Sequence, residues 1–210
     1  MCHMDDADKK KLTIELISEE ALRTSEIEGE LLSRESVQSS IQRQFGLRPP
    51  QRKISAAEQG IAEMMVDVYH SYEEPLSHER LFAWHKMLMD GRRDLHDIGE
   101  YRTDTEPMQI VSNILHDVRV HYEAPPSEDV QSQMDQFITW FNDSRADKNM
   151  GALARAGIAH LYFESIHPME DGNGRIGRAL SEKALSQSLG RPTLISLSYT
   201  INAHKKDYYD

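Results

Sequence analysis

A turn framed by two glycines separates two apolar stretches in the C-terminal part of the chain. The stretch from Leu153 to Ile166 and the stretch from Gly174 to Ser188 both repeat apolar residues at the spacing of an α-helix. Between them, a glycine on each side of Asn173 gives the backbone conformations that other residues avoid. The pattern predicts two helices joined by a tight turn, where several backbone N–H groups converge on an anion at the start of the second helix.

The side chains around this turn suit phosphate chemistry. Arg175 and Arg178 lie three residues apart, so they share one face of the second helix, and guanidinium groups match phosphate oxygens. Asp171 offers the hard oxygen ligand that magnesium, Mg2+, prefers. His167, fixed ahead of the turn by Pro168, is the group in this segment that can accept a proton near neutral pH.

Residues 167 to 178 read HPMEDGNGRIGR, which resembles the Fic family signature HPFx(D/E)GN(G/K)RxxR at every position except the third. Met169 stands there in place of the usual phenylalanine, and we expect it to fill the same core position because it is flexible and similar in bulk. The resemblance implies an all-α, mainly helical Fic fold with a small β-hairpin flap. It also implies a protein adenylyltransferase, an enzyme that moves AMP from ATP to a Ser, Thr or Tyr hydroxyl of a protein target.

The same resemblance implies a role for each residue of the motif. His167 would deprotonate the attacking hydroxyl, and Asp171 would hold Mg2+. The turn would hold the phosphates of ATP and the two arginines would bind the outer ones, which makes the expected nucleotide-binding residues of the motif Gly172, Asn173, Gly174, Arg175 and Arg178.

A second match lies upstream, where residues 24 to 29 read TSEIEG and resemble the family's inhibitory motif (S/T)xxxE(G/N). The resemblance implies that Glu28 pairs with Arg178. An arginine held by a carboxylate cannot bind the γ-phosphate, so ATP would lie with its α-phosphate misaligned and the enzyme would inhibit itself. Two alternatives stay open: a solvated acidic face near a helix end, or a glutamate that positions water to remove AMP from a modified protein.

Between Gly99 and Pro126 the helical period stops. Residues 108–111 and 118–122 are short, partly β-branched runs separated by a polar segment, which predicts a β-hairpin. Fic proteins carry their flap here, about residues 100–126, and bind the target's backbone by strand addition. The expected target-binding edge is Ile110, Val111 and Ser112.

The remaining apolar residues predict further helices, each begun by a serine or a charged run. They span about residues 8–28, 33–45, 55–72, 77–89 and 127–142, and a last helix starts at Ser198. In that helix Tyr208 and Tyr209 resemble the family's paired tyrosines beside the adenine pocket. We expect an N-terminal segment, 1–50, a Fic core, 51–210, and a longer parent chain that could add a domain such as a winged helix.

Composition narrows the partners of this 210-residue chain. Its net charge of −11, with 35 acidic against 24 basic residues, disfavours nucleic-acid binding. No apolar run approaches the roughly 20 residues that span a bilayer, so we expect no membrane partner. The single cysteine, Cys2, cannot form an internal disulfide, which favours a reducing, cytoplasmic location. The expected partners are ATP and a protein target, with a homodimer left open.

Two other functions are compatible with the scaffold. Some Fic relatives transfer UMP, phosphocholine or a γ-phosphate, but Gly174 and Arg175 stand where kinase-like relatives carry lysine after the asparagine, which favours nucleotidyl transfer. A non-catalytic, nucleotide-binding regulator would be expected to lack the base or the metal ligand. This chain retains both His167 and Asp171.

Overall fold

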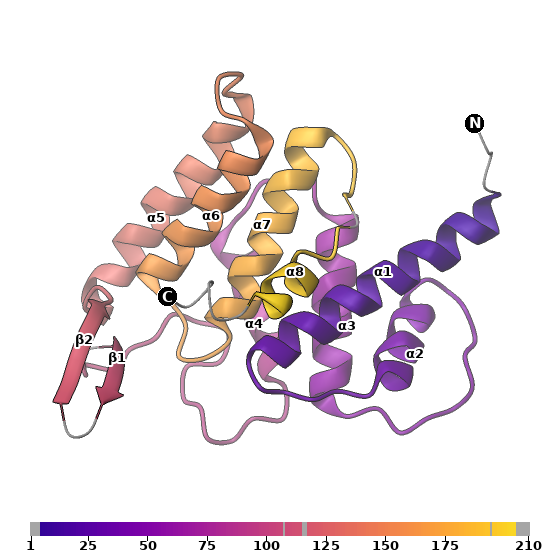
Figure 1. Cartoon of the computed structure of the whole chain (residues 1–210), viewed down its shortest axis with the longest axis horizontal. Helices are drawn as coiled ribbons and strands as arrows, with labels where there is room; N and C mark the ends of the chain where they lie inside the picture. Colours follow the sequence, from indigo (N-terminus) through magenta and orange to yellow (C-terminus); the bar gives the residue numbers. More distant parts are fainter. Residues whose placement is uncertain (1–4, 107, 115–116, 194, 205–210) are drawn as a thin grey trace.

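The structure is a computed structural model that describes residues 5–106, 108–114, 117–193 and 195–204. Within these ranges the chain forms eight α-helices, one short 3-10 helix and one two-stranded sheet (Figure 1). The elements, in chain order, are α1 (Asp6–Ile27), α2 (Arg34–Gln44), α3 (Ala56–His70), α4 (His78–Met89), β1 (Gln109–Ile114), β2 (Asp117–Glu123), α5 (Ser127–Asp143), η1 (Ser144–Ala146), α6 (Ala152–Ile166), α7 (Asn173–Leu189) and α8 (Leu197–Ala203). The predicted fold class, mainly helical with a small hairpin, is confirmed.

The helix starts follow the capping residues in the sequence. Ser33 and Ser77 each accept a hydrogen bond from a backbone N–H in the first turn of the helix that follows. Ser55 and Glu58 form a complete capping box at the start of α3. Such caps satisfy N–H groups that a helix cannot bond internally, so they fix where each helix begins.

Helix α7 lies in the middle of the helical body, against α6 along most of its length and also against α1, α3 and α4. Figure 1 shows α7 between the α5/α6 pair and α1. One core joins these helices and includes Ile17 of α1, Trp84 of α4 and Phe163 of α6. Met169 is fully buried in this core, as predicted. The N-terminal helix is thus packed against the helix that carries both motif arginines.

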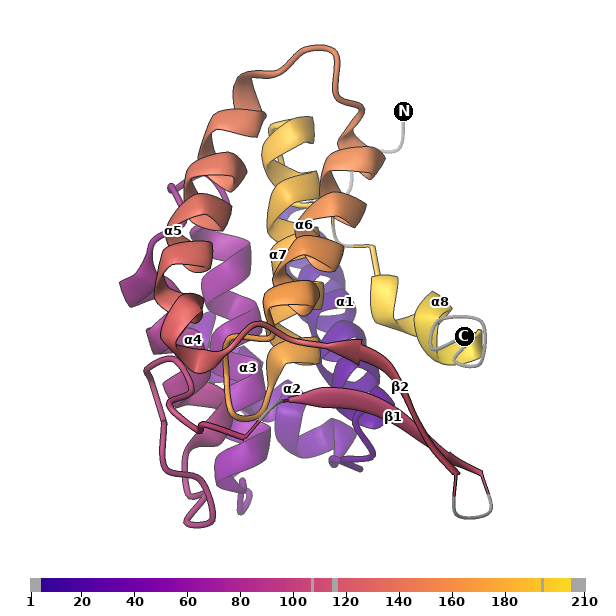
Figure 2. The same ribbon diagram turned by 90° about the vertical axis from the view of Figure 1, so that its left-hand side faces the viewer.

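The hairpin extends from this body beyond the end of α6 (Figure 2). Its strands are antiparallel, with Gln109 opposite Glu123 and an irregularity between Ile110 and Val111. At its base, the Tyr122 hydroxyl donates a hydrogen bond to the Ser165 carbonyl near the end of α6. The hairpin is therefore anchored close to the point where the motif begins.

The last helix begins at Leu197, one residue before the expected start. Tyr208 and Tyr209 lie outside the described residues. In the part of the chain that the structure describes, no helix combines the length and the apolar character needed to cross a membrane.

Candidate functional site

His167 ends α6 and turns the chain toward α7. Its φ of 50° makes it the one residue other than glycine with a positive φ among those described. This left-handed conformation is uncommon outside glycine, and it is retained because neighbouring contacts hold it. Arg102, which is buried, donates from Nε to the His167 carbonyl at 2.8 Å, and its backbone N–H donates to the Pro168 carbonyl at 2.9 Å. Arg102 therefore fixes the backbone on which the expected base stands.

The turn after His167 is held by Asn173. The side-chain amide of this buried residue accepts from the Met169 N–H at 2.9 Å and donates to the Met169 carbonyl at 2.8 Å. Gly172 adopts a φ of 82°, which brings the chain into the first turn of α7. The Asn173 side chain thus shapes the turn, whereas the sequence had suggested only contact with the nucleotide.

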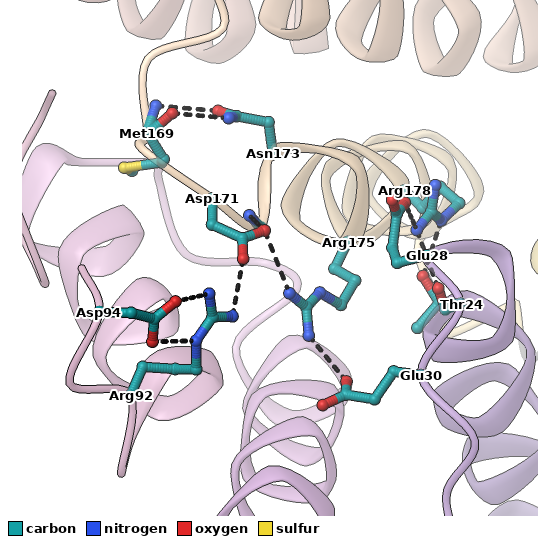
Figure 3. Close-up of polar contacts among 11 residues, drawn as sticks. Thr24, Glu28, Glu30, Arg92, Asp94, Met169, Asp171, Asn173, Arg175 and Arg178 are labelled. Carbon is teal, nitrogen blue, oxygen red and sulfur yellow. Dashed lines mark hydrogen bonds and ion pairs between the residues drawn. The ribbon is translucent and has the colours of Figure 1, made fainter. Parts of the chain in front are cut away.

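Both motif arginines are buried and paired with the end of α1 or the segment that follows it (Figure 3). Arg178, 1% exposed, donates from Nη2 to Glu28 Oε1 at 2.6 Å and from Nε to Thr24 Oγ1 at 2.7 Å. Arg175, 6% exposed, donates from Nη1 to Glu30 Oε2 at 2.9 Å. The Glu28–Arg178 pair implied by the resemblance is present, and the Glu30–Arg175 pair was not foreseen.

Glu28 lies over the turn itself. A Cβ built on Gly174 would stand 2.3 Å from Glu28 Oε1, far inside van der Waals contact. A glycine at this position therefore leaves room for an oxygen-bearing anion at the start of α7, where backbone N–H groups favour negative charge. In this structure the anion is the Glu28 carboxylate.

Asp171 is paired with Arg92, from the segment after α4. Arg92 Nη1 lies 2.8 Å from Asp171 Oδ2, and the same guanidinium also binds Asp94 (Figure 3). Burial opposes ionisation of Asp171, but the Arg92 hydrogen bond and the Arg175 charge lower its pKa overall. The side chain is therefore an ionised oxygen ligand suited to Mg2+.

No cluster of three or more His, Cys, Asp or Glu side chains that could hold a metal occurs in the part of the chain described. Mg2+ commonly binds through one or two carboxylates together with the phosphates of a nucleotide. Asp171 beside the phosphate turn fits that mode, in which the nucleotide supplies the other oxygen ligands.

His167 is suited to accept a proton. Burial lowers the pKa of its imidazole, against an opposing hydrogen bond to the Glu164 backbone, so the ring is neutral at pH 7. The Glu164 carboxyl lies close by, with Oε2 at 3.6 Å from His167 Nδ1. Burial raises the pKa of Glu164 to about 7. The sequence did not single out Glu164, whose position one helical turn before His167 is the only local signal.

The expected flap edge lies on β1. The backbone of Ile110, Val111 and Ser112 pairs with Tyr122, Val120 and Arg119 of β2. Because the sheet has only two strands within the described residues, β1 pairs with a strand on one side alone. The other side offers backbone groups of the kind that strand addition uses.

Two family models match the chain. The Fic/DOC family model matches residues 75–185, which is more than half of the chain and includes the whole motif. The model of a domain of unknown function, DUF4172, matches residues 1–47, which include α1 and both paired glutamates. The chain therefore belongs to the Fic/DOC family.

Curated relatives share parts of this sequence. A probable protein adenylyltransferase of Aquifex aeolicus is 33% identical over 67 residues, which are 32% of this chain and 20% of the relative. The protein adenylyltransferase Fic of Aedes aegypti is 32% identical over 94 residues, 44% of this chain and 18% of the relative. The chain thus spans about a fifth of the length of these relatives.

Solved structures match a larger share of this chain than the curated relatives do. The crystal structure of a Fic family protein from Desulfovibrio desulfuricans is 25% identical, with a TM-score of 0.65 over 93% of this chain and 56% of that one. A Fic domain containing signaling protein from Bacteroides thetaiotaomicron is 17% identical, with a TM-score of 0.74 over 99% and 75%. The second likeness concerns the fold alone.

Proposed function

We propose that this chain is a protein adenylyltransferase that transfers AMP from ATP to a hydroxyl group of a protein. The observation that carries the proposal is the grouping of a neutral imidazole, an ionised carboxylate and two arginines around one glycine-framed turn. The names of the curated relatives support the same activity.

In the proposed reaction, the target's hydroxyl oxygen attacks the α-phosphorus of ATP and forms a new P–O bond. His167 takes the hydroxyl proton, and the bond between the α- and β-phosphates breaks, so that pyrophosphate leaves. Arg175 and Arg178 hold the outer phosphates and place the α-phosphate for attack. Asp171 would bind Mg2+, which neutralises phosphate charge when it is present.

We propose that the resting protein inhibits itself through Glu28. While Arg178 donates to Glu28 it cannot bind the γ-phosphate, and the carboxylate fills the space above Gly174 that an anion would take. Binding of ATP in a reactive position then requires Glu28 to withdraw.

The remaining assignments complete the proposal. Ile110, Val111 and Ser112 would register the target by strand addition, and Tyr208 and Tyr209 would border the adenine. A cytoplasmic location agrees with the single cysteine, because disulfides are rare in proteins of reducing compartments.

The test uses Mg2+ and ATP labelled on the α- or the γ-phosphate, incubated with wild type, Glu28→Gly, and Glu28→Gly combined with His167→Ala. We expect α-label on protein with Glu28→Gly, little with wild type, and none with the double variant, which should still bind ATP because a general base acts mainly on the chemical step. Label from the γ-position would indicate a kinase-like reaction and refute adenylyl transfer. Label that persists without His167 would refute its role as the base.

A further inference from the structure

The segment after α1 carries two carboxylates, and each meets a different arginine of the motif. Glu28 binds Arg178, and Glu30, two residues on, binds Arg175 at 2.9 Å. Figure 3 shows the two glutamates approaching α7 from the same side. In the proposed activity, Glu28 inhibits the enzyme and Glu30 has no role.

The backbone turn at Gly29 produces this arrangement. Helix α1 ends at Ile27, and Gly29 has a φ of 82° that other residues rarely adopt. The N–H groups of Gly29 and Glu30 donate to the carbonyls of Glu26 and Ser25, each at 3.0 Å. These bonds turn the chain back on the end of α1, so that residues 28 and 30 both face α7.

Arg175 depends on Glu30 for its charge partner. Its guanidinium is nearly fully buried, and its Nε is buried without a hydrogen-bond partner. The other carboxylate near it, on Asp171, is farther away at 3.5 Å and is also bound by Arg92. Glu30 is thus the closest anion to a buried cation that the proposed function gives to an ATP phosphate.

We propose that Glu30 is a second inhibitory residue, and that Glu28 and Glu30 together occupy both phosphate-binding arginines as two adjacent phosphoryl groups would. The inference rests on the proposed nucleotide site and extends its regulation. An oligophosphate that reached Arg175 while Glu30 remained would meet a like charge beside the buried guanidinium. The whole turn of residues 28–30 must therefore move before ATP binds fully, and loss of Glu28 alone leaves Arg175 occupied.

The chain offers a matched control in Glu26. It belongs to the same acidic run, but its carboxylate binds Arg23 of α1 at 2.6 Å, and both side chains are about one third exposed. Glu26→Gln therefore removes one negative charge from this segment without freeing a motif arginine.

The experiment measures equilibrium binding, so it does not depend on transfer activity. Isothermal titration would compare Mg2+-ATP and inorganic triphosphate for wild type, Glu26→Gln, Glu28→Gln, Glu30→Gln and the Glu28→Gln/Glu30→Gln double variant. We expect Glu30→Gln to tighten binding of both ligands about tenfold, within the usual range of coupling between sites, and the double variant to bind more tightly than either single variant. Glu26→Gln should match wild type.

The possible outcomes distinguish failure of the Glu30 proposal from failure of the proposed nucleotide site. If Glu28→Gln tightens binding while Glu30→Gln behaves like Glu26→Gln, Glu30 is a structural partner only and the inference is wrong. If no variant binds ATP or triphosphate, the proposed nucleotide site is itself wrong and the inference falls with it. Melting temperatures of Glu30→Gln and Glu26→Gln without ligand show whether either change disturbs the fold.

Discussion

Glu164 provides a quantitative test of the site's electrostatics. Its carboxyl lies between His167 and α7, and its buried Oε1 has no hydrogen-bond partner. A Cβ on Gly177 would stand 2.5 Å from that oxygen, so the backbone of α7 lies directly against it. Burial raises the pKa of Glu164 from its usual 4.5 to about 7, against the opposing charge of Arg178 and with a smaller contribution from Glu28.

This raised pKa sets how stability depends on pH. Below pH 4.5 the carboxyl is protonated in both the folded and the unfolded chain. Between 4.5 and about 7 the unfolded chain releases this proton while the folded chain retains it, so the free energy of unfolding falls as the pH rises and levels off above 7. At about 1.4 kcal/mol per pH unit, this interval corresponds to roughly 3 kcal/mol.

Glu164→Gln keeps the shape of the side chain and cannot ionise. We expect it to match wild type at pH 4.5 and to exceed its stability by roughly 3 kcal/mol at pH 8, which for a chain of this size is about 6–12 °C in melting temperature. Circular dichroism melts across this range measure the difference, with exposed Glu15→Gln as the control. An offset between Glu164→Gln and wild type that is the same at every pH would show that the buried carboxyl titrates normally and would refute the reasoning.

Three further predictions concern core packing and the proposed metal ligand, Asp171. Gly60→Ala would place a Cβ 1.7 Å from a backbone oxygen of α4 and should destabilise the protein by several kcal/mol, whereas Gly157→Ala meets open space and should stabilise α6 by roughly 0.5–1 kcal/mol; urea unfolding of both tests this contrast. Met169→Ala should lower the free energy of unfolding by about 2–5 kcal/mol, as large-to-small changes in a core do, and a cost below 1 kcal/mol in the same assay would contradict its core role. Arg92→Ala should tighten Mg2+-ATP binding several-fold, because Asp171 loses a competing cation, and weaker binding in calorimetry would instead make Arg92 a ligand of the nucleotide.

The fold followed from local signals in the sequence. Apolar periodicity and serine caps place most helix ends within two or three residues, because a helix start is decided by the few residues that bond its first N–H groups. The hairpin was predictable for a similar reason, since β-branched runs separated by a polar segment favour paired strands. The last helix, α8, ends at Ala203, earlier than the expected helix that was to carry Tyr208 and Tyr209; these two residues lie outside the described part of the chain, so their expected role stays a prediction.

From the residues alone, the site was predictable where they lie close together in sequence, and the distant Glu28–Arg178 pair was expected only from the resemblance to the family. The motif places His167, Asp171 and both arginines within twelve residues. The partners Arg92 and Arg102 come from distant segments. Residues 99–103 resemble the family, but neither that resemblance nor any periodicity indicates which groups Arg92 and Arg102 contact, because this depends on how their segments pack against the turn. Glu30 is such a case as well, because its side chain reaches Arg175, 145 residues away in sequence, through the packing of α1 against α7.

The burial of the two motif arginines gives the proposed inhibition a structural reason. A buried guanidinium without a partner is strongly destabilising, so a protein that keeps Arg175 and Arg178 nearly fully buried must provide each with an anion at rest. Glu28 and Glu30 meet that requirement when no nucleotide is bound, and the phosphates of ATP would meet it in the proposed active state. The charges that we propose to bind the phosphates are therefore the same charges that hold the N-terminal segment when no nucleotide is bound. In the proposed mechanism, self-inhibition and the stability of the unliganded fold depend on one set of contacts. A variant that removes Glu28 or Glu30 should therefore lose stability without nucleotide and gain access to the proposed nucleotide site.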